Sequence, residues 1–187
     1  MNKTTVSLTQ EQYTEIIKTM KEGFSGCRPN SRVAMALTIE ANLGLRVSDI
    51  VQLKLKDIIR DGERYRLDIV EQKTGKKRTF TVPTALYQYI QQYCIDNDIK
   101  STDIIINVSE RAVQKQLKLV CDYLGYEGIG THSFRKFFAT NIYVNSDYNI
   151  SLVQTLLQHS SPSITQRYIG IGSKELETAL EQNLNLI

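Results

Sequence analysis

The sequence predicts a mainly helical fold with one small, three-stranded antiparallel sheet, an α+β class. Apolar residues recur at helical spacing over most of the 187 residues, whereas the period shortens to two between residues 57 and 83, where turn signals separate three runs. Hydrophobic residues make up 41% of the chain and charged residues 23%. A chain of this length and composition can bury a substantial core, and we predict one domain over residues 1–187.

The helices are predicted from caps and apolar stripes. Thr9 and Gln12, three residues apart, have the form of a capping box at the start of a helix. Ser161 precedes Pro162, which places a cap residue ahead of a proline at the first helical position. Helices are expected over the ranges 9–21, 33–43, 48–53, 84–96, 109–124, 132–143, 150–157, 162–168 and 173–182.

Side chains alternate in character between residues 57 and 83. Tyr65, Leu67 and Ile69 alternate with charged residues, and Phe80 and Val82 alternate with threonines. A period of two is typical of half-buried strands. The pattern therefore predicts an antiparallel meander of three strands, with turns indicated by Asp61-Gly62 and Thr74-Gly75.

A basic cluster lies at the second of these turns. The net charge of +3 is too small to indicate a partner, but Lys73, Lys76, Lys77 and Arg78 fall within six residues. Such a cluster can neutralise DNA phosphates, or it can be a solvated sheet edge protected by lysines, and both interpretations stay open. Five more basic residues lie just upstream, at Lys54, Lys56, Arg60, Arg64 and Arg66.

The cysteines and the hydropathy bear on location. Cys27, Cys94 and Cys121 are far apart and show neither metal-type nor redox spacing, which is typical of reduced thiols. No apolar run approaches the ~20 residues that a membrane-spanning helix needs. We therefore expect a cytoplasmic protein without a membrane partner.

Both histidines of the chain, His132 and His159, lie in one C-terminal block that also holds Arg135 and Tyr168. Imidazole titrates near neutrality, guanidinium binds phosphate with paired donors, and a phenol oxygen can act as a nucleophile. Each residue alone has an ordinary explanation, such as a packing tyrosine or a structural histidine. Together with Arg46 and Lys73 further upstream, the set indicates a site for DNA strand transfer.

Four segments then resemble the motifs of the tyrosine recombinase (phage integrase) family in order and spacing. They are Gly44-Leu-Arg46-Val-Ser-Asp49-Ile, His132-Ser-Phe-Arg135, Leu157-Gln-His159-Ser-Ser and Arg167-Tyr168. The resemblance runs from about residue 7 to residue 187. It implies a site-specific recombinase or integrase of a mobile or invertible element, which cuts and rejoins DNA through a 3′-phosphotyrosyl intermediate and needs neither a metal nor another cofactor.

The resemblance also implies a role for each candidate residue. Tyr168 would be the nucleophile, and Arg46 and Arg135 would clamp the non-bridging phosphate oxygens. His132 would assist removal of the tyrosine proton, and His159 would donate a hydrogen bond to the phosphate.

Lys73 would be the general acid that protonates the departing 5′-oxygen, although the neighbouring Lys76 and Lys77 leave the register of the turn open. Asp49 would support the site through hydrogen bonds rather than by chemistry. Lys76, Lys77 and Arg78 are expected to bind DNA.

The chain departs from the family pattern at two positions, since Lys136 stands where histidine is frequent and Gln158 where glycine is frequent. It also shows no N-terminal core-binding domain, so it is either a catalytic fragment or a short, single-domain member. The implied partner is double-stranded DNA, with a homotetramer on DNA and a possible monomer when free. A last helix carrying Leu176, Ala179 and Leu180 would pack on its own core or dock into a neighbouring protomer.

Two other functions fit the same residues. A type IB topoisomerase would use the same chemistry to relax supercoils without a site preference. A DNA-binding protein of the same fold could have lost catalysis, although all six candidate catalytic positions are filled, which argues against that loss. The target DNA sequence cannot be derived from the chain, because base contacts and DNA deformability would determine it.

Overall fold

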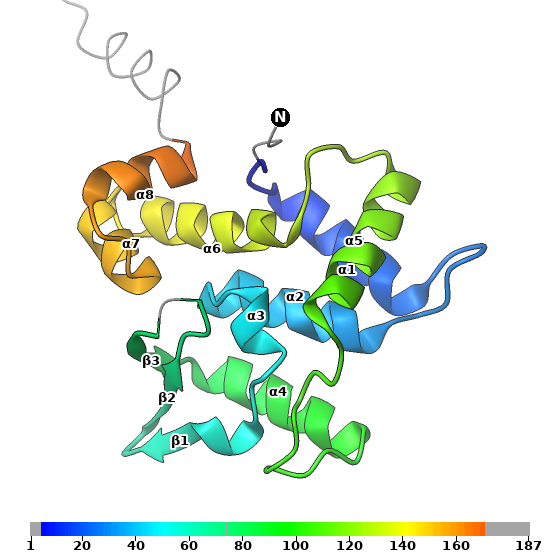
Figure 1. Cartoon of the computed structure of the whole chain (residues 1–187), viewed down its shortest axis with the longest axis horizontal. Coiled ribbons are helices and arrows are strands. Elements are labelled where there is room, and N and C mark those ends of the chain that lie inside the picture. The colour runs from blue at the N-terminus through cyan, green and yellow to red at the C-terminus, as the bar shows by residue number, and fades with distance from the viewer. Residues whose placement is uncertain (1–4, 74, 171–187) are drawn as a thin grey trace, which may run out of the picture. The chain divides into compact units, whose positions relative to one another are not determined.

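The computed structural model describes residues 5–73 and 75–170, and it confirms a mainly helical fold with a small antiparallel sheet (Figure 1). None of the helices in these ranges is long and apolar enough to cross a membrane. The predicted helix over residues 173–182 lies outside the described residues. The elements are α1 (Gln10–Glu22), α2 (Ser31–Leu43), α3 (Val47–Ile50), the 3-10 helix η1 (Leu55–Asp57), β1 (Ile58–Asp61), β2 (Arg64–Val70), β3 (Lys77–Val82), α4 (Thr84–Asp96), α5 (Glu110–Leu124), α6 (Thr131–Asn145), α7 (Ile150–Leu157) and α8 (Pro162–Ile169).

The chain divides into two compact units, residues 1–138 and residues 139–187, and α6 begins in the first and ends in the second. In the first unit, α1, α2 and α5 pack against one another (Figure 1). The predicted capping box begins α1, because Thr9 Oγ1 accepts the N–H of Gln12 at 3.1 Å and the Gln12 side chain accepts the N–H of Thr9 at 3.0 Å. The core between these helices is aliphatic and includes Ile16, Leu37 and Val113.

The sheet has the order β1-β2-β3, and both pairs are antiparallel, as the meander predicts. Leu67 at the centre of β2 is buried, with Ile58 and Phe80 as its partners in the register. Helix α4 packs on β2, where Tyr65 and Tyr87 stack with ring centroids 3.7 Å apart. The turn between β2 and β3 is the one that carries Lys73.

A connection after α4 was not predicted. Lys54 and Ile104 form an isolated antiparallel bridge, and the N–H of Ile105 donates to Leu53 O at 2.9 Å. Ile105 and Ile106, which follow this bridge, are buried in the core. Residues 97–108 lack a clear period, so their extended pairing with a segment about 50 positions earlier is not visible in the sequence.

Gly44 ends α2 in a left-handed conformation, with φ +58°, and its N–H donates to Glu40 O at 2.9 Å. A side chain has no room here, because a Cβ on Gly44 would lie 2.3 Å from a ring carbon of Phe138. Backbone conformation and close packing therefore both require glycine two residues before Arg46.

The second unit holds α7 and α8, which pack on each other. Helix α7 ends at Gln158, whose φ of +54° also lies in the left-handed region. This conformation favours glycine, and the structure shows that glutamine is accommodated there. Ser161 caps α8 by accepting the N–H of Ile164, with Pro162 at the first helical position as predicted.

Gly44→Ala is expected to lower the free energy of unfolding by about 2–6 kcal/mol, since left-handed strain and overpacking against Phe138 each cost about 1–3 kcal/mol. The measurement is urea unfolding followed by circular dichroism. Gly125→Ala is the matched control, because Gly125 caps α5 with φ +74° but a Cβ there meets nothing within 4 Å. A loss no greater than that of the control would contradict the packing argument.

Candidate active site

Three predicted catalytic residues from distant segments line one cavity of about 330 Å³ in the first unit. Arg46 is the N-cap residue of α3, Lys73 lies in the turn between β2 and β3, and His132 is the second residue of α6. The remaining lining residues are Val47, Ser48, Gln72 and Glu110. The cavity therefore collects cationic and titratable groups, a composition suited to an anionic ligand.

Arg46 is held on one side and open on the other. Its Nη1 lies 2.5 Å from Glu71 Oε2, and its side chain is 19% exposed whereas that of Glu71 is 1% exposed. The carboxylate fixes one edge of the guanidinium, and the rest of the group faces the cavity.

Arg135 is three residues after His132 on α6 and is almost completely buried. Its Nη1 donates to the carbonyl oxygen of Gly44. The two predicted clamp residues thus approach the same loop: Arg46 lies within it, and Arg135 binds its backbone.

The pKa of His132 is lowered from its usual value of 6.5. Loss of bulk water around the ring is the largest cause, and the charges of Arg135, Lys73 and Arg46 add to it, whereas Glu110 acts in the opposite direction. The neutral ring that results can accept a proton near neutral pH.

The second unit holds the other two predicted residues. His159 Nδ1 lies 3.0 Å from Thr165 Oγ1, and the rings of His159 and Tyr168 meet edge to face with centroids 5.1 Å apart. The N–H of His159 donates to Gln154 O at 3.1 Å, and Gln154 Nε2 donates to His159 O at 3.2 Å. Backbone and side-chain bonds therefore fix the histidine beside the tyrosine.

The basic cluster separates into exposed and buried members. Lys76 and Lys77 are exposed, as expected for DNA-binding residues, but the Arg78 side chain is only 3% exposed. Arg78 Nη1 lies 3.6 Å from Glu71 Oε1, and its Nη2 donates to Leu43 O at 3.4 Å. Arg78 thus differs from the expectation for a DNA-binding side chain, because its guanidinium is engaged inside the protein.

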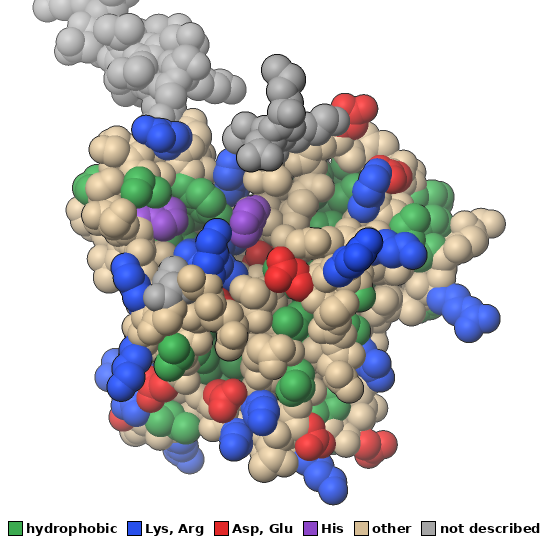
Figure 2. All heavy atoms as spheres, in the orientation of Figure 1, with side chains coloured by type: hydrophobic (Ala, Val, Ile, Leu, Met, Phe, Trp, Pro, Cys, Tyr) green, Lys and Arg blue, Asp and Glu red, His purple; other side chains and the backbone are tan. Residues whose placement is uncertain are grey.

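The basic residues upstream are also partly engaged. Arg66 lies 3.1 Å from Asp68 and 3.5 Å from Asp61, and Arg64 lies 3.7 Å from Asp61. Figure 2 shows basic and acidic side chains interleaved over the part of the molecule that holds the sheet. On the face shown, the sheet therefore carries side chains of mixed charge and no continuous basic surface.

Sequence reasoning missed Glu71, although a signal was present. Alternate residues of β2 face inward, among them Leu67 and Ile69. Continuing this alternation by two residues past Ile69 reaches Glu71. In β3 the same phase runs back from Val82 to Arg78, the partner of Ile69 in the register. The period of two thus predicts that both charged residues face inward, where they pair.

Two further acids near the site were also missed. Glu110, the first residue of α5, lines the cavity beside His132. Glu40 on α2 is completely buried, and neither of its carboxylate oxygens bonds to any described residue. Burial raises the pKa of Glu40 well above its usual value while Arg135 opposes that shift, so the neutral acid is favoured.

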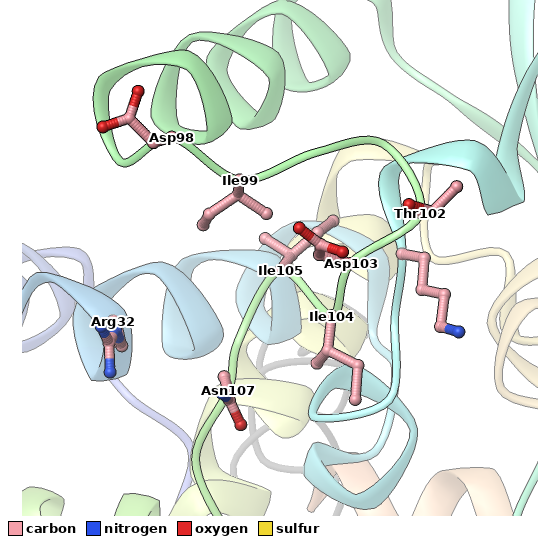
Figure 3. A pocket seen from close by; sticks show the side chains of 9 residues that line it. Arg32, Asp98, Ile99, Thr102, Asp103, Ile104, Ile105 and Asn107 are labelled. Atoms are coloured by element: carbon pink, nitrogen blue, oxygen red, sulfur yellow. The ribbon is translucent and has the colours of Figure 1, made fainter.

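A larger cavity, of about 500 Å³, lies elsewhere in the first unit (Figure 3). Its lining mixes Arg32 and Lys54 with Asp98 and Asp103, and it includes none of the predicted site residues. Ile99, Ile104 and Ile105 form part of its wall, so it follows the unpredicted connection after α4. Size alone would therefore select the wrong cavity for the chemistry that the residues indicate.

Comparison with known proteins finds one matching family and several similar proteins. The model of the Phage integrase family matches residues 6–174. The probable integrase/recombinase YoeC of Bacillus subtilis (strain 168) is 33% identical over 158 residues, which cover 80% of this chain and 83% of YoeC. The tyrosine recombinase XerA of Pyrococcus furiosus is 28% identical over 184 residues, 94% of this chain but only 61% of XerA.

The fold is also similar to that of solved recombinases. The crystal structure of the XerH site-specific recombinase bound to its palindromic difH substrate matches with a TM-score of 0.70 at 20% identity. The match covers 94% of this chain and 52% of that protein. The chain thus spans about half the length of XerH, and at this identity the likeness concerns the fold.

The His132 pKa can be tested by an NMR pH titration, in which a His132→Asn variant identifies one of the two histidine signals. We expect the His132 midpoint below 6.5. Its contribution to folding stability is then complete above about pH 6.5 and is lost as the pH falls through the folded pKa. Lys73→Ala should raise the midpoint, whereas Lys76→Ala, which removes a charge from the same turn, should leave it unchanged. Equal shifts in both variants would contradict the assigned geometry.

Proposed function

Since the chain belongs to the phage integrase family, the tyrosine recombinases, we propose that it is a site-specific DNA recombinase whose residues 1–187 act as one catalytic domain. The observation that carries the proposal is the cavity shared by Arg46, Lys73 and His132, with Arg135 on the same helix as His132. The first unit supplies these groups, and the second supplies His159 and Tyr168.

In the proposed cleavage step, Tyr168 Oη attacks the phosphorus of a phosphodiester. A bond forms between this oxygen and phosphorus while the bond from phosphorus to the 5′-oxygen breaks. His132 takes up the tyrosine proton, and Lys73 gives a proton to the departing oxygen. The products are a 3′-phosphotyrosyl bond and a free 5′-hydroxyl, and a hydroxyl of a partner strand reverses the step.

Arg46 and Arg135 hold the two non-bridging oxygens, on which charge develops in the pentacoordinate transition state. Their contacts with Glu71 and with Gly44 O orient them before the substrate arrives. Asp49 supports the turn of Lys73, because its Oδ1 accepts the N–H of Gln72 at 2.8 Å.

His159 gives a hydrogen bond to the same phosphate. When the Thr165 hydroxyl donates to Nδ1, 3.0 Å away, and not to Ser161 O, 3.5 Å away, the neutral ring carries its proton on Nε2. That tautomer has a donor available for the phosphate. The contact with Thr165 thus suits the role proposed for His159.

The proposed substrate is double-stranded DNA of a mobile or invertible element in the cytoplasm, and the proposed assembly is a homotetramer on that DNA. Lys76 and Lys77 are exposed next to the cavity turn and would contact phosphates of the backbone. XerH, whose fold this chain shares, was crystallised bound to its difH substrate. This supports DNA as the proposed partner.

Tyr168→Phe is expected to abolish covalent attachment to DNA and to leave DNA binding nearly unchanged, because it removes one oxygen and keeps the ring. The measurement uses nicked duplexes from the DNA flanking the gene, denaturing electrophoresis for the adduct and fluorescence anisotropy for binding. Tyr148→Phe is the matched control, since Tyr148 is an exposed tyrosine of the same unit.

Equal loss of binding and attachment in Tyr168→Phe would identify a structural tyrosine and contradict the proposal. Binding without any adduct in the unaltered protein would favour a catalytically silent DNA-binding protein. Relaxation of supercoiled DNA without a preferred site would favour a type IB topoisomerase.

A further inference from the structure

Glu71 closes the turn that carries Lys73. Its N–H donates to Lys76 O at 3.0 Å, and its carbonyl oxygen accepts the N–H of Gly75 at 2.8 Å. It directly follows β2, and its side chain is 1% exposed. A buried carboxylate thus lies at the base of the turn.

The Glu71 carboxylate lies between two guanidinium groups. Oε2 is 2.5 Å from Arg46 Nη1, and Oε1 is 3.6 Å from Arg78 Nη1. Arg78 also donates to Leu43 O, which anchors this pair to the end of α2. Burial and the charge of Arg135 lower the pKa of Arg78 to about 10, and Glu71 opposes that shift.

Two hydrogen bonds join α3 to the turn, and each segment supplies one carboxylate acceptor. Asp49 on α3 accepts the N–H of Gln72 in the turn, while Glu71 at the base of the turn accepts from Arg46 at the start of α3. These two carboxylates join the segments that supply Arg46 and Lys73 to the cavity. The position of Arg46 relative to Lys73 therefore depends on them.

We propose that Glu71 is a positioning residue for strand cleavage, which holds the Arg46 guanidinium at the angle from which it can clamp the scissile phosphate. The inference rests on the proposed recombinase function. Glu71 does not contact DNA in this role: one carboxylate oxygen accepts a hydrogen bond from Arg46, and the other forms an ion pair with Arg78 at 3.6 Å. Glu71 affects cleavage indirectly, because it orients the charged Arg46 guanidinium that binds the phosphate.

Glu71→Gln is the informative variant, because an amide keeps the shape but has one acceptor oxygen for two arginines. One guanidinium then faces an NH₂ donor. Cleavage of an ordinary nicked duplex is expected to slow by about tenfold to a hundredfold, as for a misplaced catalytic group. Asp68→Asn is the matched control, since Asp68 is an exposed carboxylate of β2 that pairs with Arg66.

Two modified duplexes separate a role through Arg46 from a role through Lys73. A methylphosphonate at the scissile position is neutral and needs less cationic clamping, so the deficits of Glu71→Gln and Arg46→Ala should both shrink to within about threefold. A 5′-bridging phosphorothiolate has a thiolate leaving group that needs no proton. This duplex should restore the cleavage rate of Lys73→Ala, whereas cleavage by Glu71→Gln should remain slow.

A Glu71→Gln rate equal to that of the unaltered protein on all three duplexes would overturn the proposal. An equal loss on all three would also overturn it, since that pattern indicates general loss of structure. If the unaltered protein forms no adduct on any duplex, the recombinase function itself fails.

A measurement on the unaltered protein does not depend on whether the variant folds. The Arg46 Nε–Hε NMR signal is expected to show a rigid group, because Glu71 holds it. A freely moving Arg46 side chain would contradict the positioning role.

Discussion

The left-handed conformation of Gly44 is the constraint on which the candidate site depends. It ends α2 and turns the chain so that Arg46 follows two residues later at the start of α3. The carbonyl oxygen of the same glycine accepts from Arg135, and the Phe138 ring occupies the space that any side chain would need. One peptide thus sets the positions of both predicted phosphate clamps, and only glycine fits there.

Around this peptide the first unit buries several ionisable side chains. They are Glu40, which is favoured as the neutral acid, and Asp49, Glu71, Arg78 and Arg135. Charges removed from water are costly unless they pair, and the observed contacts supply such pairing for Glu71 with Arg46 and Arg78. The cationic groups also lower the pKa of His132. A bound phosphate would offset this positive charge, so the electrostatics and the proposed reaction are mutually consistent.

Much of the fold was predictable, because local periods and caps determine it. The capping box at Thr9, the three-stranded meander and the cap at Ser161 follow from short segments. Contacts between distant segments were not predictable: Arg135 meets Gly44 across 91 positions, and residues near Ile104 pair with the chain at Lys54. The inward positions of Glu71 and Arg78 follow from the period of two, but their charge suggested exposure. The motifs named the candidate residues, including the supporting carboxylate Asp49, whereas the roles of Glu71 and Glu110 emerged only from the packing.

A crystal structure of the Tyr168→Phe variant bound to a nicked duplex of its own site would test the proposed phosphate clamp. We predict that the guanidinium groups of Arg46 and Arg135 and the ring of His159 contact the non-bridging oxygens of one phosphate, with the phenyl ring that replaces the Tyr168 side chain facing the phosphorus. A duplex whose phosphates contact only Lys76 and Lys77, or the larger cavity at Arg32 and Lys54, with no phosphate between the two clamp arginines, would contradict this arrangement.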